Sequence, residues 1–196
     1  MDSKNPLQGQ QSAGNPPPSR IAVFCVGNRL MLDEGLGPAL YDELVSEYEF
    51  SENVRLFDVG CMSLDMLELV RDFDLLITVD ALDATDSEPG TIFRFCPEDM
   101  KRRAGAMQSL HDLRLTDLFD TAALLGYEAK GLCLGMQVEN MSPIDLTIGL
   151  TPKVHTALPR LVDTLLAELV RSGAEVKVIK TGQLVDASWL HPQLSS

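Results

Sequence analysis

Acidic side chains and one histidine stand directly after several apolar runs of the sequence. Two carboxylates and an imidazole can bind a borderline transition metal such as nickel or zinc and leave coordination positions open for another ligand. Of the three histidines, only His111 falls beside the acids, because His155 lies on a predicted helix flank and His191 in a tail. The candidates are Asn28, Asp33, Glu34, Asp80, Asp83, Asp86, His111, Glu139 and Asn140.

The apolar runs predict buried strands, and segments with helical periodicity alternate with them. This alternation is typical of a mostly parallel sheet covered by helices on both faces, a three-layer α/β domain. Ligands of such sheets bind beyond the carboxyl ends of the strands, where the acids and His111 are expected. We expect strands over 21–27, 54–60, 74–80, 90–95 (at an edge), 131–139 and 174–180, and helices over 36–50, 63–73, 109–126 and 151–173.

Four of these polar residues also have a purely structural interpretation. Asp33 and Glu34 could simply favour the positive end of the following helix dipole. Asp80 could be an Asx-turn residue that ends a strand. His111 could be a surface histidine in a first helical turn, since Ser109 and Asp112 have the spacing of a capping box. The spacing alone leaves these alternatives open.

Other catalytic patterns are missing from the sequence. It contains no G-x-x-x-x-G-K-[ST], H-E-x-x-H or G-x-S-x-G, and the segment 35–40 lacks the third glycine of G-x-G-x-x-G. The absent phosphate-binding motifs argue against a nucleotide-binding domain. A nucleophile pair of Cys61 and His111 is conceivable, but no local pattern supports it.

Composition restricts the class of partner. The formal net charge of −13 disfavours nucleic acid and anionic membrane surfaces. The four cysteines form no C-x-x-C pair, which favours reduced cysteines that act as small hydrophobic residues.

With no signal peptide and no apolar run near 18 residues, a cytoplasmic protein is expected. We expect a disordered tail over 1–19, one α/β domain over 20–180 and a C-terminal tail over 181–196.

The segment 26–40, VGNRLMLDEGLGPAL, resembles the N-terminal signature of the hydrogenase maturation proteases, G-N-x-L-x-x-D-[DE]-G-x-G after a strand. Further blocks similar to those of the family follow in the same order at 74–84, 89–95, 109–126 and 138–154. The resemblance covers roughly residues 20–172. One departure is Cys25, which stands where many members of the family have a glycine.

The resemblance implies a twisted, mostly parallel five-stranded sheet and an endopeptidase activity. The substrate would be the precursor of the large subunit of a nickel–iron hydrogenase, which loses its C-terminal extension after nickel is inserted. Carried over by position, the catalytic residues and metal ligands fall on Glu34, Asp80 and His111. The nickel would be supplied by the substrate, and zinc or cadmium are expected to substitute in vitro.

The resemblance leaves the cleavage step open. The metal could polarise the scissile carbonyl or activate a water molecule, or Asp33 or Glu34 could serve as general base. Leu30, Met31 and Leu32 are candidates to contact the precursor, with burial as the alternative. A non-catalytic module that binds a metal or a partner through the same three ligands is the competing hypothesis.

Overall fold

In the computed structural model of the protein, the described residues are 19–60, 66–83, 87–96 and 110–186, without the side chains of 110–116. The predicted tail over 1–19 lies outside these residues except for Ser19, and so does 187–196 of the other predicted tail. Ser63, where a helix was expected to begin, and the residues Cys61, Asp86 and Ser109 are also outside them.

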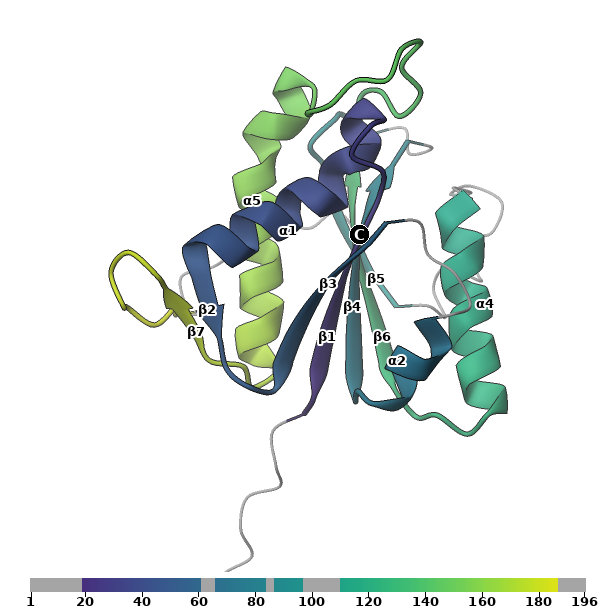
Figure 1. Ribbon diagram of the computed structural model, residues 1–196, viewed down its shortest axis with the longest axis vertical. Helices are drawn as coiled ribbons and strands as arrows, with labels where there is room; N and C mark the ends of the chain where they lie inside the picture. Colours follow the sequence, from purple (N-terminus) through teal and green to yellow (C-terminus); the bar gives the residue numbers. More distant parts are fainter. Residues whose placement is uncertain (1–18, 61–65, 84–86, 97–109, 187–196) are drawn as a thin grey trace, which may run out of the picture.

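A five-stranded sheet forms the centre of the fold (Figure 1). Four strands are parallel, and β5 at one edge runs antiparallel to its neighbour β6. In spatial order the strands are β3 (Val54–Gly60), β1 (Ile21–Val26), β4 (Leu75–Leu82), β6 (Lys130–Gln137) and β5 (Ile92–Phe95). The predicted mostly parallel sheet is therefore confirmed.

Helices cover both faces of this sheet (Figure 1). Helices α1 (Leu36–Glu47) and α5 (Pro152–Arg171) lie on one face, and α2 (Leu67–Arg71) and α4 (Leu110–Leu124) lie on the other. The internal strand β1 is buried on both faces, and its alternate side chains point to opposite sides. Ile21, Val23 and Cys25 belong to the core beneath α1 and α5, whereas Ala22, Phe24 and Val26 belong to the core beneath α2 and α4. The three-layer α/β fold is confirmed.

The predicted helix over 36–50 is too long. Helix α1 ends at Glu47, and the next three residues form β2 (Tyr48–Phe50), which pairs antiparallel with β7 (Val176–Val178) in a separate two-stranded sheet. Tyr48 and Phe50 favour extended backbone, and the partner strand that captures them is distant in the sequence.

Two further boundaries differ near the expected site. The loop expected over residues 28–35 contains a 3-10 helix, η1 (Leu32–Gly35). Strand β4 continues to Leu82, two residues beyond the expected end at Asp80. It extends because its pairing with β6 continues through Leu82 and Gln137.

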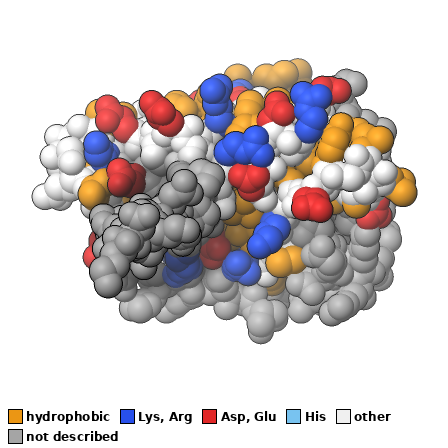
Figure 2. All heavy atoms as spheres, turned by 90° about the horizontal axis from the view of Figure 1, so that it is seen from below, with side chains coloured by type: hydrophobic (Ala, Val, Ile, Leu, Met, Phe, Trp, Pro, Cys, Tyr) orange, Lys and Arg blue, Asp and Glu red, His pale blue; other side chains and the backbone are white. Residues whose placement is uncertain are grey.

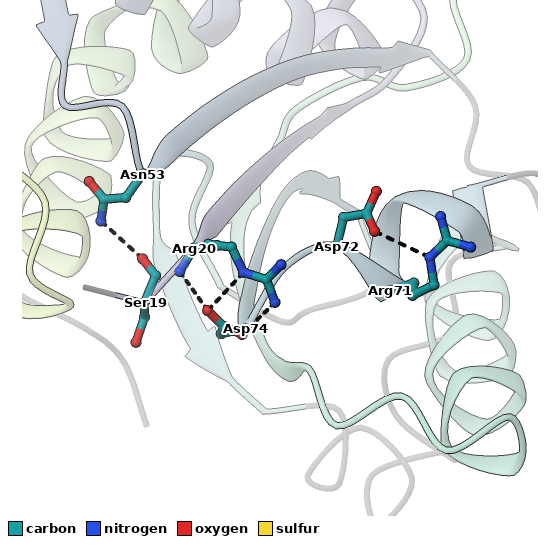
Figure 3. A network of polar contacts seen from close by, with 6 residues as sticks. All are labelled: Ser19, Arg20, Asn53, Arg71, Asp72 and Asp74. Atoms are coloured by element: carbon teal, nitrogen blue, oxygen red, sulfur yellow. Dashed lines mark hydrogen bonds and ion pairs between the residues drawn. The ribbon is translucent and has the colours of Figure 1, made fainter. Parts of the chain in front are cut away.

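The amino ends of the strands are held together by polar contacts (Figure 3). Arg20, before β1, donates to the Asp74 carboxylate with its backbone N–H at 2.7 Å, its Nε at 3.3 Å and its Nη2 at 2.9 Å. The Asn53 side chain donates to the Ser19 carbonyl at 2.9 Å. These bonds fix where β1, β3 and β4 begin relative to one another.

A hollow of about 1080 Å³ lies at this amino end, between Arg20, Arg71, Tyr127 and Arg171. Basic and acidic side chains alternate over this face (Figure 2). The arginines have carboxylate partners: Arg20 pairs with Asp74, Arg71 with Asp72, and Arg171 with Glu168. Since parallel sheets bind ligands at their carboxyl ends, we look for the functional site at the opposite end. No helix among the described residues is long and apolar enough to cross a membrane.

Cys25 is expected to resist alkylation in the folded protein. It is fully buried in β1, and burial, with a smaller contribution from Asp58, raises the pKa of its thiol to about 12. The reactive thiolate is therefore scarce at pH 8, and reagent has no access. Peptide mapping by mass spectrometry after iodoacetamide treatment should find Cys25 unmodified without denaturant and modified in urea. Rapid labelling of the native protein would contradict this placement.

Candidate active site

The turn that follows β1 carries Glu34 and is closed by its own hydrogen bonds. The backbone N–H of Asn28 donates to the Glu34 carbonyl at 3.1 Å, and the Glu34 N–H donates to the Met31 carbonyl at 3.2 Å. The Asn28 side-chain oxygen accepts the Leu30 N–H at 3.0 Å. Glu34 is thereby fixed in η1 at the carboxyl end of β1.

Two glycines of the signature allow this turn to pack against β1. A Cβ atom at Gly27 would lie 1.9 Å from the Glu34 carbonyl oxygen, and one at Gly37 would lie 2.0 Å from the Val26 carbonyl oxygen. Both obstacles are backbone atoms, which cannot move aside as the end of a side chain can. Gly27 also has a φ of 143°, a conformation that other residues rarely adopt. These two positions of the signature therefore have a steric role.

Leu32 begins η1 in a strained conformation. Its φ is 52°, in the left-handed region that a leucine rarely occupies. Its N–H donates to the Thr147 carbonyl at 2.7 Å, and the Thr147 N–H donates back to the Leu30 carbonyl at 2.9 Å. Strain of this kind persists only where surrounding contacts determine the backbone, and it is concentrated at functional sites.

Asp33 joins three segments at this end of the sheet. It is fully buried, and its carboxylate accepts the N–H groups of Glu139 at 3.1 Å and Asn140 at 2.9 Å, just after β6. It also accepts the Thr151 N–H at 2.6 Å and the Thr151 hydroxyl at 2.9 Å. Thr151 is the N-cap of α5, where a carboxylate is favoured by the helix dipole.

This environment argues against Asp33 as general base. Its two oxygens already accept four hydrogen bonds, and the side chain has no exposed surface. A general base must reach the proton that it removes. Of the two acids considered for this role, the half-buried Glu34 is the one at the surface of the site.

Asp80 lies within β4 and not after it, which corrects the expected strand end. It is 4% exposed, opposite Gly135 of β6, and its Oδ1 accepts the Ala81 N–H at 2.8 Å. Strand alternation places Asp80 on the same face as Leu76, which packs in the core beneath α2 and α4. Since η1 contacts β4, the elements that carry Glu34 and Asp80 are neighbours.

Residue 111 lies in the first turn of α4. This helix covers the sheet face on which Asp80 lies, and it begins at the carboxyl end of the strands (Figure 1). The side chain of His111 is outside the described part of the chain, so the three-ligand set of Glu34, Asp80 and His111 stays a prediction. Among the side chains that are described, no group of three His, Cys, Asp or Glu residues is placed to hold a metal ion.

Arg29 neutralises acids beside the site. Its Nη2 donates to Asp58 Oδ2 at 2.7 Å and to Asp42 Oδ1 at 3.0 Å, and its Nε donates to Asp58 Oδ2 at 3.2 Å. The hydrogen bond from Arg29 holds the pKa of Asp42 below its usual range. Neither this cluster nor the contact between Asp33 and Thr151 was predicted from the sequence. The Thr-Pro pair at 151–152 signals a helix start, but no local pattern links it to Asp33.

The fold and the site together define a class: α/β proteins with a carboxylate-lined site at the carboxyl end of a mostly parallel sheet. The model of the hydrogenase maturation protease family, HycI, matches residues 38–168. The Hydrogenase 2 maturation protease of Escherichia coli is 31% identical over 157 residues, which cover 80% of this chain and 94% of that protein. The hydrogenase expression/formation protein HupD of Rhizobium leguminosarum is 32% identical over 177 residues, 88% of this chain and 85% of that protein.

Solved structures agree with the sequence comparison. The hydrogenase maturating endopeptidase HybD from Escherichia coli superposes with a TM-score of 0.74 at 29% identity, covering 82% of this chain and 98% of that one. The chain belongs to the hydrogenase maturation protease family. The predicted enzyme class, a peptidase and therefore a hydrolase, is confirmed.

Gly37→Ala is expected to destabilise the protein far more than Gly35→Ala. At Gly37 the new Cβ would meet the backbone of Val26, whereas at Gly35 the nearest atom is at 3.4 Å, the start of the range of ordinary contact. Gly35 also has a φ of −74°, which alanine adopts readily. We expect a loss of about 1–3 kcal/mol for Gly37→Ala in urea unfolding. Equal stabilities of the two variants would contradict the steric role of Gly37.

Asp33→Asn is expected to destabilise the protein by about 2 kcal/mol, because part-buried N–H and O–H donors lose a charged acceptor that is fully buried. The asparagine amide has one oxygen in place of two, and its NH2 group faces donors. Thermal and urea unfolding measure the loss. Asp145→Asn, on the exposed part of the same loop, is the control and should unfold like the wild type. Wild-type stability of Asp33→Asn would mean that the three segments are held together by other contacts.

Proposed function

We propose that the protein is an endopeptidase that removes the C-terminal extension of a nickel-loaded hydrogenase large-subunit precursor. The observation that carries the proposal is the contact of η1, with Glu34, against β4, with Asp80, at the end of the sheet where α4 begins. The relatives named above are described as maturation proteases and endopeptidases of hydrogenases, which supports the same activity. This also disfavours a non-catalytic binding module. The cytoplasmic location expected from the sequence fits an enzyme that meets a precursor before the hydrogenase is complete.

In the proposed mechanism, Glu34 and Asp80 offer carboxylate oxygens and His111 an imidazole nitrogen to nickel that the precursor already holds. Carboxylate and imidazole ligands suit a borderline divalent ion, and zinc or cadmium are proposed as substitutes in vitro. The metal contact exists only with a loaded precursor, so binding energy that positions the scissile peptide is available only after nickel insertion. The enzyme thus discriminates between loaded and empty substrate.

Asp80 and Glu34 would contribute differently to this contact. Asp80 is embedded in a central strand and its Oδ1 is bonded to the Ala81 N–H, so its position is set before the substrate arrives. Glu34 stands in a short 3-10 turn and is half-buried, so it is the acid placed to reach the peptide and to accept a proton from the attacking water. The water oxygen bonds to the scissile carbonyl carbon, the peptide C–N bond breaks, and the proton accepted by Glu34 passes to the departing amine nitrogen, which leaves a new C-terminal carboxylate.

Glu34→Gln, Asp80→Asn and His111→Ala are each expected to reduce processing by about 100-fold or more. Removing a metal ligand should reduce activity at least as much as removing a residue that only supports a ligand. Processing is followed by gel shift and by mass spectrometry of purified, nickel-loaded precursor. Circular dichroism checks the fold, which Asp80→Asn should keep because the amide oxygen can still accept the Ala81 N–H.

Asp83→Asn is the matched control, since Asp83 is exposed one residue beyond β4 and should leave processing unchanged. Metal-free precursor is the second control and should remain uncut by the wild type. Full activity in any of the three site variants would refute the assignment of that residue. Processing of metal-free precursor at the same rate would refute nickel recognition.

A further inference from the structure

Four large apolar side chains project into solvent beside the turn that carries Glu34. We name them the apolar rim: Leu30, which is 45% exposed, and Ile144, Leu146 and Ile148, which are 103%, 74% and 79% exposed. Leu30 follows β1, and the other three lie between β6 and α5. Apolar side chains gathered on a surface in this way mark interaction sites.

The two segments of the apolar rim are joined by backbone hydrogen bonds. Thr147 forms a parallel bridge with Met31, accepting the Leu32 N–H at 2.7 Å and donating to the Leu30 carbonyl at 2.9 Å. Side chains alternate in extended backbone, so Leu146 and Ile148 lie on the side opposite to the half-buried Thr147. The bridge therefore turns apolar side chains outward and the threonine inward, the reverse of the usual arrangement.

The loop that presents these side chains is fastened at both ends. Asp33 accepts N–H groups of Glu139 and Asn140 at its start and of Thr151 at its end. Inside the loop, the Asn140 side chain accepts the Ser142 N–H at 3.0 Å. These contacts hold the loop in a conformation that presents its isoleucines and leucine to solvent, where a partner can cover them.

The basic side chains next to the apolar rim are paired within the chain. Arg29 forms ion pairs with Asp42 and Asp58, and Lys153 pairs with Glu139 at 3.0 Å. A partner at this place therefore finds exposed apolar area, with the exposed carboxylate of Asp145 between Ile144 and Leu146. An apolar protein segment fits that surface, and its attraction is expected to depend weakly on salt.

We propose that the apolar rim is the docking surface for an apolar segment of the hydrogenase precursor, and that it binds the precursor whether or not nickel is present. This inference rests on the proposed function, because it takes the occupant of the rim to be the chain that presents its peptide to Glu34. Leu30 and Glu34 belong to one turn closed by Asn28, so a polypeptide that reaches Glu34 passes the rim. Docking by apolar contact and recognition by metal are then separate steps.

The test compares two variants. The triple variant carries Ile144→Ser, Leu146→Ser and Ile148→Ser, and the control is a double variant with Leu124→Ser and Leu125→Ser. The control leucines are 88% and 55% exposed at the C-terminal end of α4, away from the site. With nickel-loaded precursor, the triple variant should raise KM at least about 10-fold with kcat unchanged, and the control should match the wild type. Circular dichroism and thermal unfolding confirm that both variants are folded.

A binding measurement separates this inference from the proposed function. Glu34→Gln protein should bind metal-free precursor in calorimetry, with an affinity that changes little up to high salt, and adding the triple substitution should weaken it at least about 10-fold. An unchanged KM and unchanged binding in the triple variant would overturn docking while processing by the wild type still supports the peptidase. Binding that depends on the rim without any cleavage by the wild type would support docking and overturn the peptidase.

Light scattering tests the remaining occupant, a second copy of this chain. A monomeric wild type supports the proposal. A wild-type dimer that the triple substitution converts to monomers would overturn it, because the apolar rim would then be an interface between copies.

Discussion

The buried carboxylate of Asp33 is the contact on which the geometry of the site depends. It accepts hydrogen bonds from the segment after β6 and from the N-cap of α5, while its own backbone leads directly into Glu34. A carboxylate without hydrogen-bond partners would be costly at this depth, but four donors compensate for its desolvation. The neighbouring acids of the signature thus have different tasks, since Asp33 organises the loops and Glu34 faces the site.

Asp33 and the two tightly packed glycines act on the same turn from opposite sides. Gly27 and Gly37 let the turn lie against the backbone of β1, and Asp33 draws the loop before α5 onto it. The strained φ of Leu32 is tolerated because both sets of contacts determine the backbone there. A site held in this way can present Glu34 beside the strand of Asp80 without rearrangement.

The sequence predicted the fold well where one strand or helix is determined by its own residues. A continuous apolar run such as 21–26 predicts a strand buried on both faces without information from distant residues. The alternation of strands and helices then indicates a parallel sheet. The helix over 36–50 was wrong at its end because the fate of Tyr48 depends on β7, more than 120 residues later in the chain. The 3-10 turn at Leu32 has a similar cause, since its hydrogen bonds to Thr147 are long-range.

The site residues stay a prediction, and their surroundings could not be predicted from the sequence. The resemblance pointed to Glu34 and Asp80, whose elements η1 and β4 are in contact in the structure. The roles of Asp33 and Arg29 could not be predicted, because each depends on partners from distant segments. Periodicity also placed Asp80 after a strand, whereas the pairing with β6 continues past it.

Because Gly27 and Gly37 have a steric role, the signature as a whole indicates a folded chain and does not by itself indicate an active enzyme. Selection for a folded chain alone would preserve both glycines and Asp33, even in a descendant that no longer cuts any substrate. Such a descendant would no longer be under selection for the catalytic task proposed for Glu34. A search for active members among new genomes should therefore weight that one position above the rest of the motif.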